Sequence, residues 1–363
     1  MAARSMDKFS LYLEIVPLPV LAALVFVMGM IYLMMPANTR FYATFLIMPA
    51  WLAASLCPEL GPLQAVTKIS SGLLFLLVAI AAMLRPVPRR PLPGIIWLYL
   101  GGSLYLGLCL IGAENAFDEL LIQFQWIMLV LAAIATVATV TRMEDLQILI
   151  KVLTAGSLLA ILIPLSAVLL NPGEIFGKIG RFSPWGAMPN LIGITFLMGC
   201  PLFLYAILTT RSQFVKLIMA AALISSIGMT LITGSRQVAF SLAIAMALMC
   251  FPLIRRPGVL IAGGVGAFLI LPFFAGLNEE AVNRLSSFDT SGRLSIWWEY
   301  FKLSFRQPLG LLGTQGQSAH VAPTVGQGNH AHNVFLDMLY VGGWPYLLTM
   351  ASVIAVSLGS MWR

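Results

Sequence analysis

The sequence contains little charge and, over most of its length, no histidine. Only 10% of its 363 residues are Asp, Glu, Lys or Arg, against about 25% in an ordinary soluble domain. The chain is 60% hydrophobic with a mean hydropathy of +0.93, and this composition excludes a soluble globular domain. The four cysteines, Cys57, Cys109, Cys200 and Cys250, lie in or at the ends of apolar runs without paired spacing. That placement is typical of packing residues.

Apolar runs long enough to cross a lipid bilayer recur along the chain. A membrane-spanning helix needs about 20 mostly apolar residues, so the pattern predicts an all-α, polytopic membrane helix bundle with about eleven transmembrane helices, within a range of about 10–12. The runs are roughly 16–35, 42–57, 68–84, 94–112, 120–140, 150–170, 190–209, 214–232, 237–254, 258–275 and 333–359. Residues 1–275 would hold the first ten helices, 276–332 a long loop, and 333–363 the last helix. We interpret the first run as a retained helix rather than a signal peptide.

Basic residues gather in alternate connections between these runs. They are Arg40, Arg85, Arg89, Arg90, Arg142, Lys151, Arg211, Lys216, Arg255, Arg256 and Arg363. By the positive-inside rule these connections face the cytoplasm, so the intervening ones, with the long loop, face the outside. Topology therefore accounts for the net charge of +7, and no nucleic-acid partner is indicated. Eleven crossings would place Arg4 and Lys8 outside, unless the N-terminus is an exception or the weak run 42–57 does not cross fully.

Three polar stretches rich in Gly or Pro interrupt the apolar pattern on the outer side. They are the segment 171–190, the turn 233–237 and the long loop. Within the loop, apolar residues recur at helical spacing and predict an amphipathic helix over 293–306 that lies in the membrane interface or caps the bundle. These residues are Leu294, Trp297, Trp298, Phe301 and Phe305. Because the three stretches open on the same side, we expect them to converge on one site.

All three histidines, His320, His330 and His332, fall within this loop, just before the last apolar run. Histidine titrates near pH ~6.5 when unperturbed, which suits a general base that removes a proton from an acceptor hydroxyl. The His-x-His spacing is also compatible with a metal site. Against a metal, no carboxylate lies near the histidines in the loop, and Asp337 falls inside the next run.

The segment that ends the loop resembles the histidine motif of the bacterial O-antigen ligase, O-antigen polymerase and O-oligosaccharyltransferase superfamily. It reads His332-Asn333, nine further residues, and then Gly343-Trp-Pro-Tyr346. Three further elements resemble the family in the same order: Gly180-Arg181 with Pro189-Asn190; Thr233-Gly-Ser235-Arg236; and Ser291-Gly292-Arg293 with Trp297 and Pro308-Leu-Gly310. The resemblance covers roughly residues 180–350. The chain departs from the family by ending one run after the histidine motif.

The resemblance implies a glycosyltransferase of the bacterial inner membrane that acts outside the cytoplasm. It would move an oligo- or polysaccharide from undecaprenyl pyrophosphate to an acceptor glycolipid or glycan, with no cofactor and no obligatory metal. It implies that His332 is the general base and that Asn333 orients sugar hydroxyls or the histidine. Arginines stabilise the charge that develops on a leaving pyrophosphate. The candidates for that role are Arg236, Arg293, Arg181 and, as a further phosphate contact, Lys68.

Alternatives remain open at this stage. An arginine at a helix end, such as Arg236, can simply reach the membrane interface, and loop arginines such as Arg181 are usually solvated. The motif does not separate a ligase, whose acceptor is lipid A core, from a polymerase, whose acceptor is a second lipid-linked glycan. Protein O-glycosylation and a metal-dependent membrane enzyme using the histidines are further alternatives. A transporter would place charges near the bilayer midplane, where the predicted runs hold little beyond Glu14 and Asp337.

Overall fold

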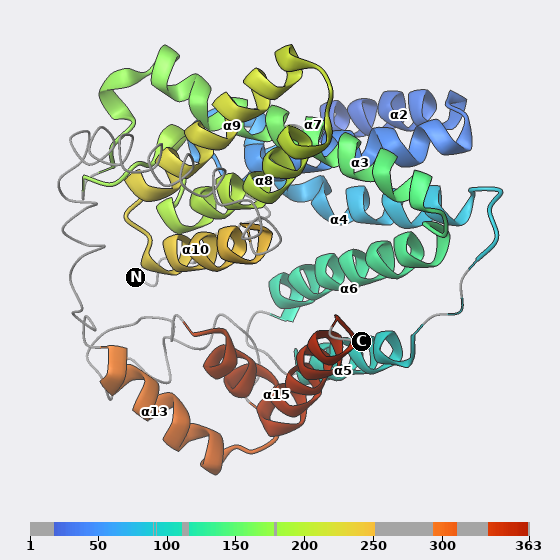
Figure 1. The fold of residues 1–363 in the computed structure, drawn as a ribbon. Coiled ribbons are helices and arrows are strands. Elements are labelled where there is room, and N and C mark those ends of the chain that lie inside the picture. Colours follow the sequence, from blue (N-terminus) through green and yellow to red (C-terminus); the bar gives the residue numbers. More distant parts are fainter. Residues whose placement is uncertain are drawn as a thin grey trace. The chain divides into compact units, whose positions relative to one another are not determined.

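The computed structural model describes residues 18–89, 91, 93–110, 116–177, 180–250, 293–310 and 333–361. Within these residues the fold is all-α, as predicted, with one isolated β-bridge and no strand (Figure 1). The helices are α2 (Leu18–Met34), α3 (Ala37–Ser55), η1 (Pro58–Leu60), α4 (Pro62–Met83), α5 (Gly94–Leu110), α6 (Ala116–Thr139), α7 (Met143–Leu170), η2 (Pro172–Glu174), η3 (Pro184–Gly186), α8 (Pro189–Thr209), α9 (Gln213–Ile232), α10 (Arg236–Cys250), α13 (Arg293–Arg306) and α15 (Val334–Met361).

Among the described residues, five helical segments are long and apolar enough to cross a membrane, which makes the chain a multi-pass membrane protein. They are Pro62–Met83, Met143–Leu170, Pro189–Thr209, Gln213–Ile232 and Met338–Ser357. Ten of the eleven predicted runs coincide with a described helix, and the run 258–275 lies outside the described residues. The weak run 42–57 corresponds to α3, which is not among the five segments and contains Pro49 in its interior.

The helices divide into two compact units. The first unit consists of residues 1–11, 72–141 and 289–363, and contains most of α4 with α5, α6, α13 and α15. The second unit consists of residues 12–71 and 142–288, and contains α2, α3, the start of α4 and α7 to α10.

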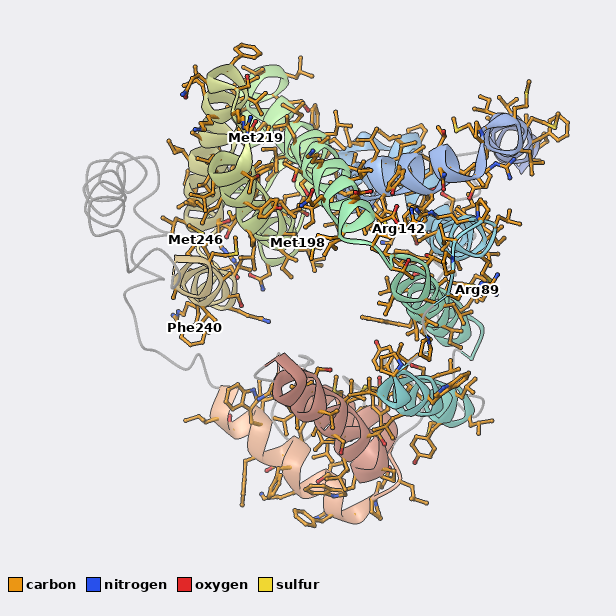
Figure 2. All side chains as sticks on the ribbon, turned by 45° about the vertical axis from the view of Figure 1, so that its right-hand side comes forward. Arg89, Arg142, Met198, Met219, Phe240 and Met246 are labelled. Atoms are coloured by element: carbon orange, nitrogen blue, oxygen red, sulfur yellow. The ribbon has the colours of Figure 1, made fainter. Side chains whose placement is uncertain are left out.

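In the second unit α8 packs against α7, α9 and α10. Its buried side chains, Ile192, Phe196, Cys200 and Phe203, recur every three or four residues and so form one face of the helix. Met219 on α9 belongs to the same buried cluster (Figure 2). On α10, by contrast, Phe240 is 69% exposed and stands on the outer surface (Figure 2). Large apolar side chains exposed in this way fit a lipid environment rather than water.

Among the described helices of the second unit, α3 and α7 pack against each other most extensively. Pro49 lacks a backbone N–H, so it cannot satisfy the carbonyl of Phe45 one turn earlier in α3. Gly156 of α7 lies against this point, and a Cβ on it would come within 2.6 Å of the Leu46 carbonyl oxygen. The glycine therefore lets the two backbones approach where the proline interrupts α3.

In the first unit α15 packs against α5 and α13. The helix α13 has the bounds predicted for the amphipathic helix, Arg293–Arg306. Its packed face differs from the predicted one, because Ile296 and Tyr300 are buried against Tyr340 and Val341 of α15. The ring centroids of Tyr300 and Tyr340 are 5.3 Å apart.

The residues predicted to form the apolar face of α13 are mostly exposed, although the ring of Phe305 also packs beside Trp344 of α15. Leu294, Trp298 and Phe305 are 59%, 56% and 63% exposed, whereas Trp297 is partly buried. The helical periodicity was thus correct, but the chain carries two apolar faces on this helix. Spacing alone could not show which of them packs against protein.

Candidate functional site

The sequence elements that carry the family resemblance meet in pairs, one pair in each unit. In the second unit the element around Arg181 and Asn190 contacts the Thr233–Arg236 element. We call these residues the arginine cluster: Arg181, Asn190, Thr233, Ser235 and Arg236. In the first unit the Pro308-Leu-Gly310 element contacts Gly343 and Trp344.

The connection between α7 and α8 folds into a short hairpin-like loop. Phe176 and Phe182 form an antiparallel bridge. The Gly177 N–H donates to the Arg181 carbonyl over 2.9 Å, and the Ser183 N–H donates to the Ile175 carbonyl over 2.8 Å. These bonds connect the two sides of the loop, residues 175–177 and 181–183, and place Arg181 at its base.

Trp185 fastens this loop to α7. Its indole Nε1 donates to the Ile163 carbonyl and to the Ser166 Oγ, both at 3.1 Å. Its backbone φ of 52° is left-handed, a conformation that non-glycine residues adopt rarely. Sequence reasoning did not single out Trp185, because strain of this kind has no signal in the residue type.

Arg181 connects the loop to the α9–α10 turn and to the start of α8. Its side chain is only 7% exposed. Nε donates to the Thr233 carbonyl over 2.7 Å, and Nη2 donates to Asn190 Oδ1 over 2.8 Å. Two bonds from one rigid guanidinium fix both the distance and the angle between the segments that it joins.

The α9–α10 turn is the predicted tight turn, and its polar groups bond both to neighbouring residues and to residues 181 and 182. Gly234 has a left-handed φ of 59°, the conformation that commonly ends a helix. The Thr233 Oγ1 donates to the Thr230 carbonyl over 2.6 Å. The Phe182 N–H lies 3.4 Å from the Ile232 carbonyl. Residues 181 and 182 therefore supply donors to the last carbonyls of α9, which lack partners within the helix.

Arg236 begins α10 directly after this turn. Its side chain is half-buried, and the preceding Ser235 is 3% exposed. The N-terminus of a helix carries partial positive charge and free N–H groups, so a cation is disfavoured there and an anion is favoured. An arginine in this position is suited to binding an anion together with the helix terminus.

Lys68 and Glu59 belong to the same unit. Lys68 is exposed near the start of α4. Glu59 lies in η1 against Gly186, whose left-handed φ is 67° and on which a Cβ would come within 3.0 Å of Glu59 Oε1. Burial, with a smaller contribution from Glu59, raises the pKa of the nearby Cys57 thiol to about 12. Cys57 lies in the connection between α3 and η1 and is fully buried.

In the first unit the chain segments at Gly310 and Gly343 cross at very short distance. The Trp344 N–H donates to the Pro308 carbonyl over 2.9 Å. Both glycines have positive φ, 94° and 65°. The rings of Phe301 and Phe305 pack beside Trp344 and fasten α13 to the same point.

Tyr105 on α5 supports this crossing, because its hydroxyl donates to the Leu309 carbonyl over 2.9 Å. The two residues are 204 positions apart. Sequence reasoning missed Tyr105, since nothing in its local pattern distinguishes it from other tyrosines in apolar helices.

Asn333 caps α15. Its Oδ1 accepts from the Phe335 N–H at 3.0 Å and lies 3.5 Å from the Leu336 N–H, the arrangement typical of an N-cap asparagine. The residue expected to orient sugar hydroxyls or His332 therefore has its only side-chain oxygen directed at the helix, which leaves its amide nitrogen. Arg293 is the first residue of α13. His320, His330 and His332 lie outside the described residues, and with them the metal-binding alternative.

Two of the four cysteines have buried side chains without disulfides, as expected of packing residues. Cys57 and Cys200 are both fully buried, and Cys109 is partly buried. No protein-family model, no curated protein and no solved structure matches the chain.

Proposed function

We propose that the protein is a membrane glycosyltransferase that moves a glycan from undecaprenyl pyrophosphate to an acceptor hydroxyl outside the cytoplasm, in the manner of an O-antigen ligase. Under this proposal the protein crosses the bacterial inner membrane with about eleven helices. The observation that carries it is the arginine cluster. The bond from Arg181 Nε to the Thr233 carbonyl joins two sequence elements that resemble the family. The two residues are 52 positions apart.

The distribution of charge in the second unit supports the orientation. The starts of α3, α7 and α9 lie near Arg40, Arg142 and Arg211, and we assign this end to the cytoplasm by the positive-inside rule. The opposite end carries the 171–188 connection and the α9–α10 turn, where Arg181 contacts Thr233. The arginine cluster then faces the periplasm or the outside, where a flipped lipid-linked glycan would be reached.

The residues available fit the chemistry of such a transfer. The acceptor oxygen bonds to the anomeric carbon while the bond from that carbon to the pyrophosphate oxygen breaks. The leaving undecaprenyl pyrophosphate takes the electron pair, and its charge is stabilised by Arg236 with the N-terminus of α10, and by Arg293. Lys68 is a further phosphate contact in this scheme. His332 accepts the proton of the acceptor hydroxyl.

Substitution of the two central residues tests the proposal. We expect His332→Ala and Arg236→Ala each to abolish glycan transfer in a complemented deletion strain, while the protein remains inserted at normal abundance. Matched controls are His330→Ala, from the same loop, and Arg211→Ala, an exposed arginine before α9. Near-normal transfer by either central variant removes the role assigned to that residue.

Glycan profiling of the deletion strain also identifies the acceptor. Loss of a ligase leaves polymerised glycan on its lipid carrier, unattached to lipid A core. Loss of a polymerase leaves single repeat units instead. A strain with unaltered surface glycans would overturn the proposal as a whole.

A further inference from the structure

On the basis of the proposed function, we infer that Arg181 is a positioning residue: it holds the α9–α10 turn, and through that turn Arg236, in the orientation in which Arg236 stabilises the charge that develops on the leaving pyrophosphate. It would act by fixing backbone, without itself contacting the donor. Its contacts and its burial carry this inference.

The Arg181 guanidinium is bonded to oxygens within the protein. Two of its three nitrogens donate to protein oxygens, at 2.7 Å to the Thr233 carbonyl and at 2.8 Å to Asn190 Oδ1. The side chain is 7% exposed. An arginine that holds a phosphate usually presents its paired N–H groups to the ligand, whereas here part of that donor set is used within the protein.

The bond to the Thr233 carbonyl lies close in sequence to Arg236. Thr233 directly follows α9, and only two residues, Gly234 and Ser235, separate its bonded carbonyl from Arg236 at the start of α10. The left-handed Gly234 gives the turn a wide choice of conformations when nothing else holds it. The bond from Arg181 removes that freedom and sets the direction in which α10 begins.

The second hydrogen bond of Arg181 is accepted by Asn190. Asn190 is the second residue of α8, and α8 packs directly against α10 and α9. A Cβ on Gly193, one turn further along α8, would lie 3.3 Å from both Thr233 Oγ1 and Val238 of α10. Arg181 thus ties the turn to the helix that already contacts both of its arms.

Kinetics of the purified full-length enzyme, with the lipid-linked glycan extracted from source cells as donor, test the inference. We expect Arg181→Lys and Asn190→Leu each to lower kcat at least ~tenfold while the donor KM stays within ~twofold, because orientation is lost and ground-state binding is kept. Lysine keeps the charge of Arg181 but cannot form the two-pronged contact. Asn190→Asp keeps an acceptor oxygen opposite Arg181 and should retain kcat within ~threefold of wild type.

A second measurement does not depend on activity. Cys57 is fully buried in the same cluster as Phe182 and Ala187, which belong to the loop that Arg181 anchors. In a background where Cys109, Cys200 and Cys250 are alanine, N-ethylmaleimide should modify Cys57 at least ~tenfold faster in Arg181→Lys and Asn190→Leu than in the parent, because the loop opens locally. Asn190→Asp should leave the labelling rate unchanged.

The outcomes separate this inference from the proposed function. A raised donor KM with unchanged kcat and a protected Cys57 would show that Arg181 contacts the donor directly, and would overturn the inference. If the wild-type protein transfers no glycan but the labelling follows the expected pattern, then Arg181 holds the loop and turn in place and the proposed function fails. If Asn190→Asp behaves like Asn190→Leu in both measurements, the inference is wrong.

Discussion

Gly343 and Gly310 cross so closely that neither can carry a side chain. A Cβ on Gly343 would come within 2.5 Å of the Gly310 nitrogen, and a Cβ on Gly310 within 2.5 Å of the Gly343 nitrogen. Their φ angles of 65° and 94° are also in the region that favours glycine. The spacing between Asn333 and Gly343 in the histidine motif therefore has a local structural basis: it places a glycine where the chain after α13 returns to α15.

Gly343→Ala should destabilise the protein strongly. The backbone conformation alone costs a side-chain-bearing residue about 1–3 kcal/mol, and the clash with the Pro308 and Leu309 backbone adds to that cost. We expect thermal denaturation of the purified protein in detergent to show a lower midpoint, with loss of the ring contacts between Trp344 and Phe305.

Gly101→Ala is the matched control for this substitution. Gly101 lies in α5 of the same unit, and a Cβ there would meet nothing within 4 Å. Because alanine is favoured over glycine inside a helix by about 0.5–1 kcal/mol, the control should be neutral or slightly stabilising. Equal midpoints of thermal denaturation for the two variants would mean that the segments at Gly310 and Gly343 can move apart at no cost in stability.

Asn333 offers a way to separate capping from chemistry. Asn333→Asp keeps the oxygen that accepts from the Phe335 N–H, so the denaturation midpoint should be unchanged, whereas Asn333→Ala should cost about 1 kcal/mol. Under the proposed function the amide nitrogen is the group left for sugar hydroxyls or His332. Asn333→Asp should then lower transfer at least ~tenfold, since a hydrogen-bond donor is lost.

The stability measurement decides how that result is interpreted. If transfer and midpoint fall together only in Asn333→Ala, then capping explains the motif residue and the amide has no separate role. Asn333→Ser is a useful third variant, because serine caps helices well but cannot reproduce the amide.

The sequence predicted the helical architecture and several helix bounds because apolar runs and helix breakers are local signals. The bounds of α13, from Arg293 to Arg306, follow from periodicity and from Pro308. The tight turn at Thr233-Gly234 was likewise predictable from the sequence, because glycine in that position ends a helix.

The bond from Arg181 to the Thr233 carbonyl was not predictable from the sequence. It joins positions 52 residues apart, and its acceptor is a backbone oxygen that every residue possesses. The packed face of α13 escaped prediction for a related reason. Ile296 and Tyr300 are no more apolar than Trp298 and Phe305, so only the position of α15 decides which pair is buried.

Two buried hydroxyls on α9 should be dispensable for the fold. Within the described part of the chain, Ser226 Oγ and Thr230 Oγ1 have no hydrogen-bond partner, and both residues are fully buried. A buried polar group without a partner costs about 1–3 kcal/mol. Ser226→Ala and Thr230→Val should therefore leave the midpoint of thermal denaturation unchanged or raise it.

Thr233→Val provides the contrast for these two substitutions. The Thr233 Oγ1 donates to the Thr230 carbonyl over 2.6 Å, so its removal should lower the midpoint. A marked loss of stability in Ser226→Ala would indicate instead that the hydroxyl holds a bound water that the fold requires.

The outward face of α13 should contact membrane lipid. Leu294, Trp298 and Phe305 are each more than half exposed, and Lys302 and Arg306 lie on the neighbouring polar edge, where Lys302 pairs with Glu299 at 2.9 Å. A helix with one face on protein, one aromatic face and one charged edge is suited to the membrane interface. The aromatic face would then enter the headgroup region, and the charged edge would stay in water.

Cysteine substitution at two adjacent positions tests this orientation. In a cysteine-free background inserted in sealed vesicles, Phe305→Cys should react with a membrane-impermeant maleimide at least ~tenfold more slowly than Arg306→Cys, because lipid shields only the former. In micelles with only enough detergent to keep the protein soluble, Phe305→Cys should still react more slowly than Arg306→Cys, since the detergent replaces the lipid. Rapid labelling of Phe305→Cys in vesicles would place this face in water, and α13 would then cap the first unit without touching the membrane.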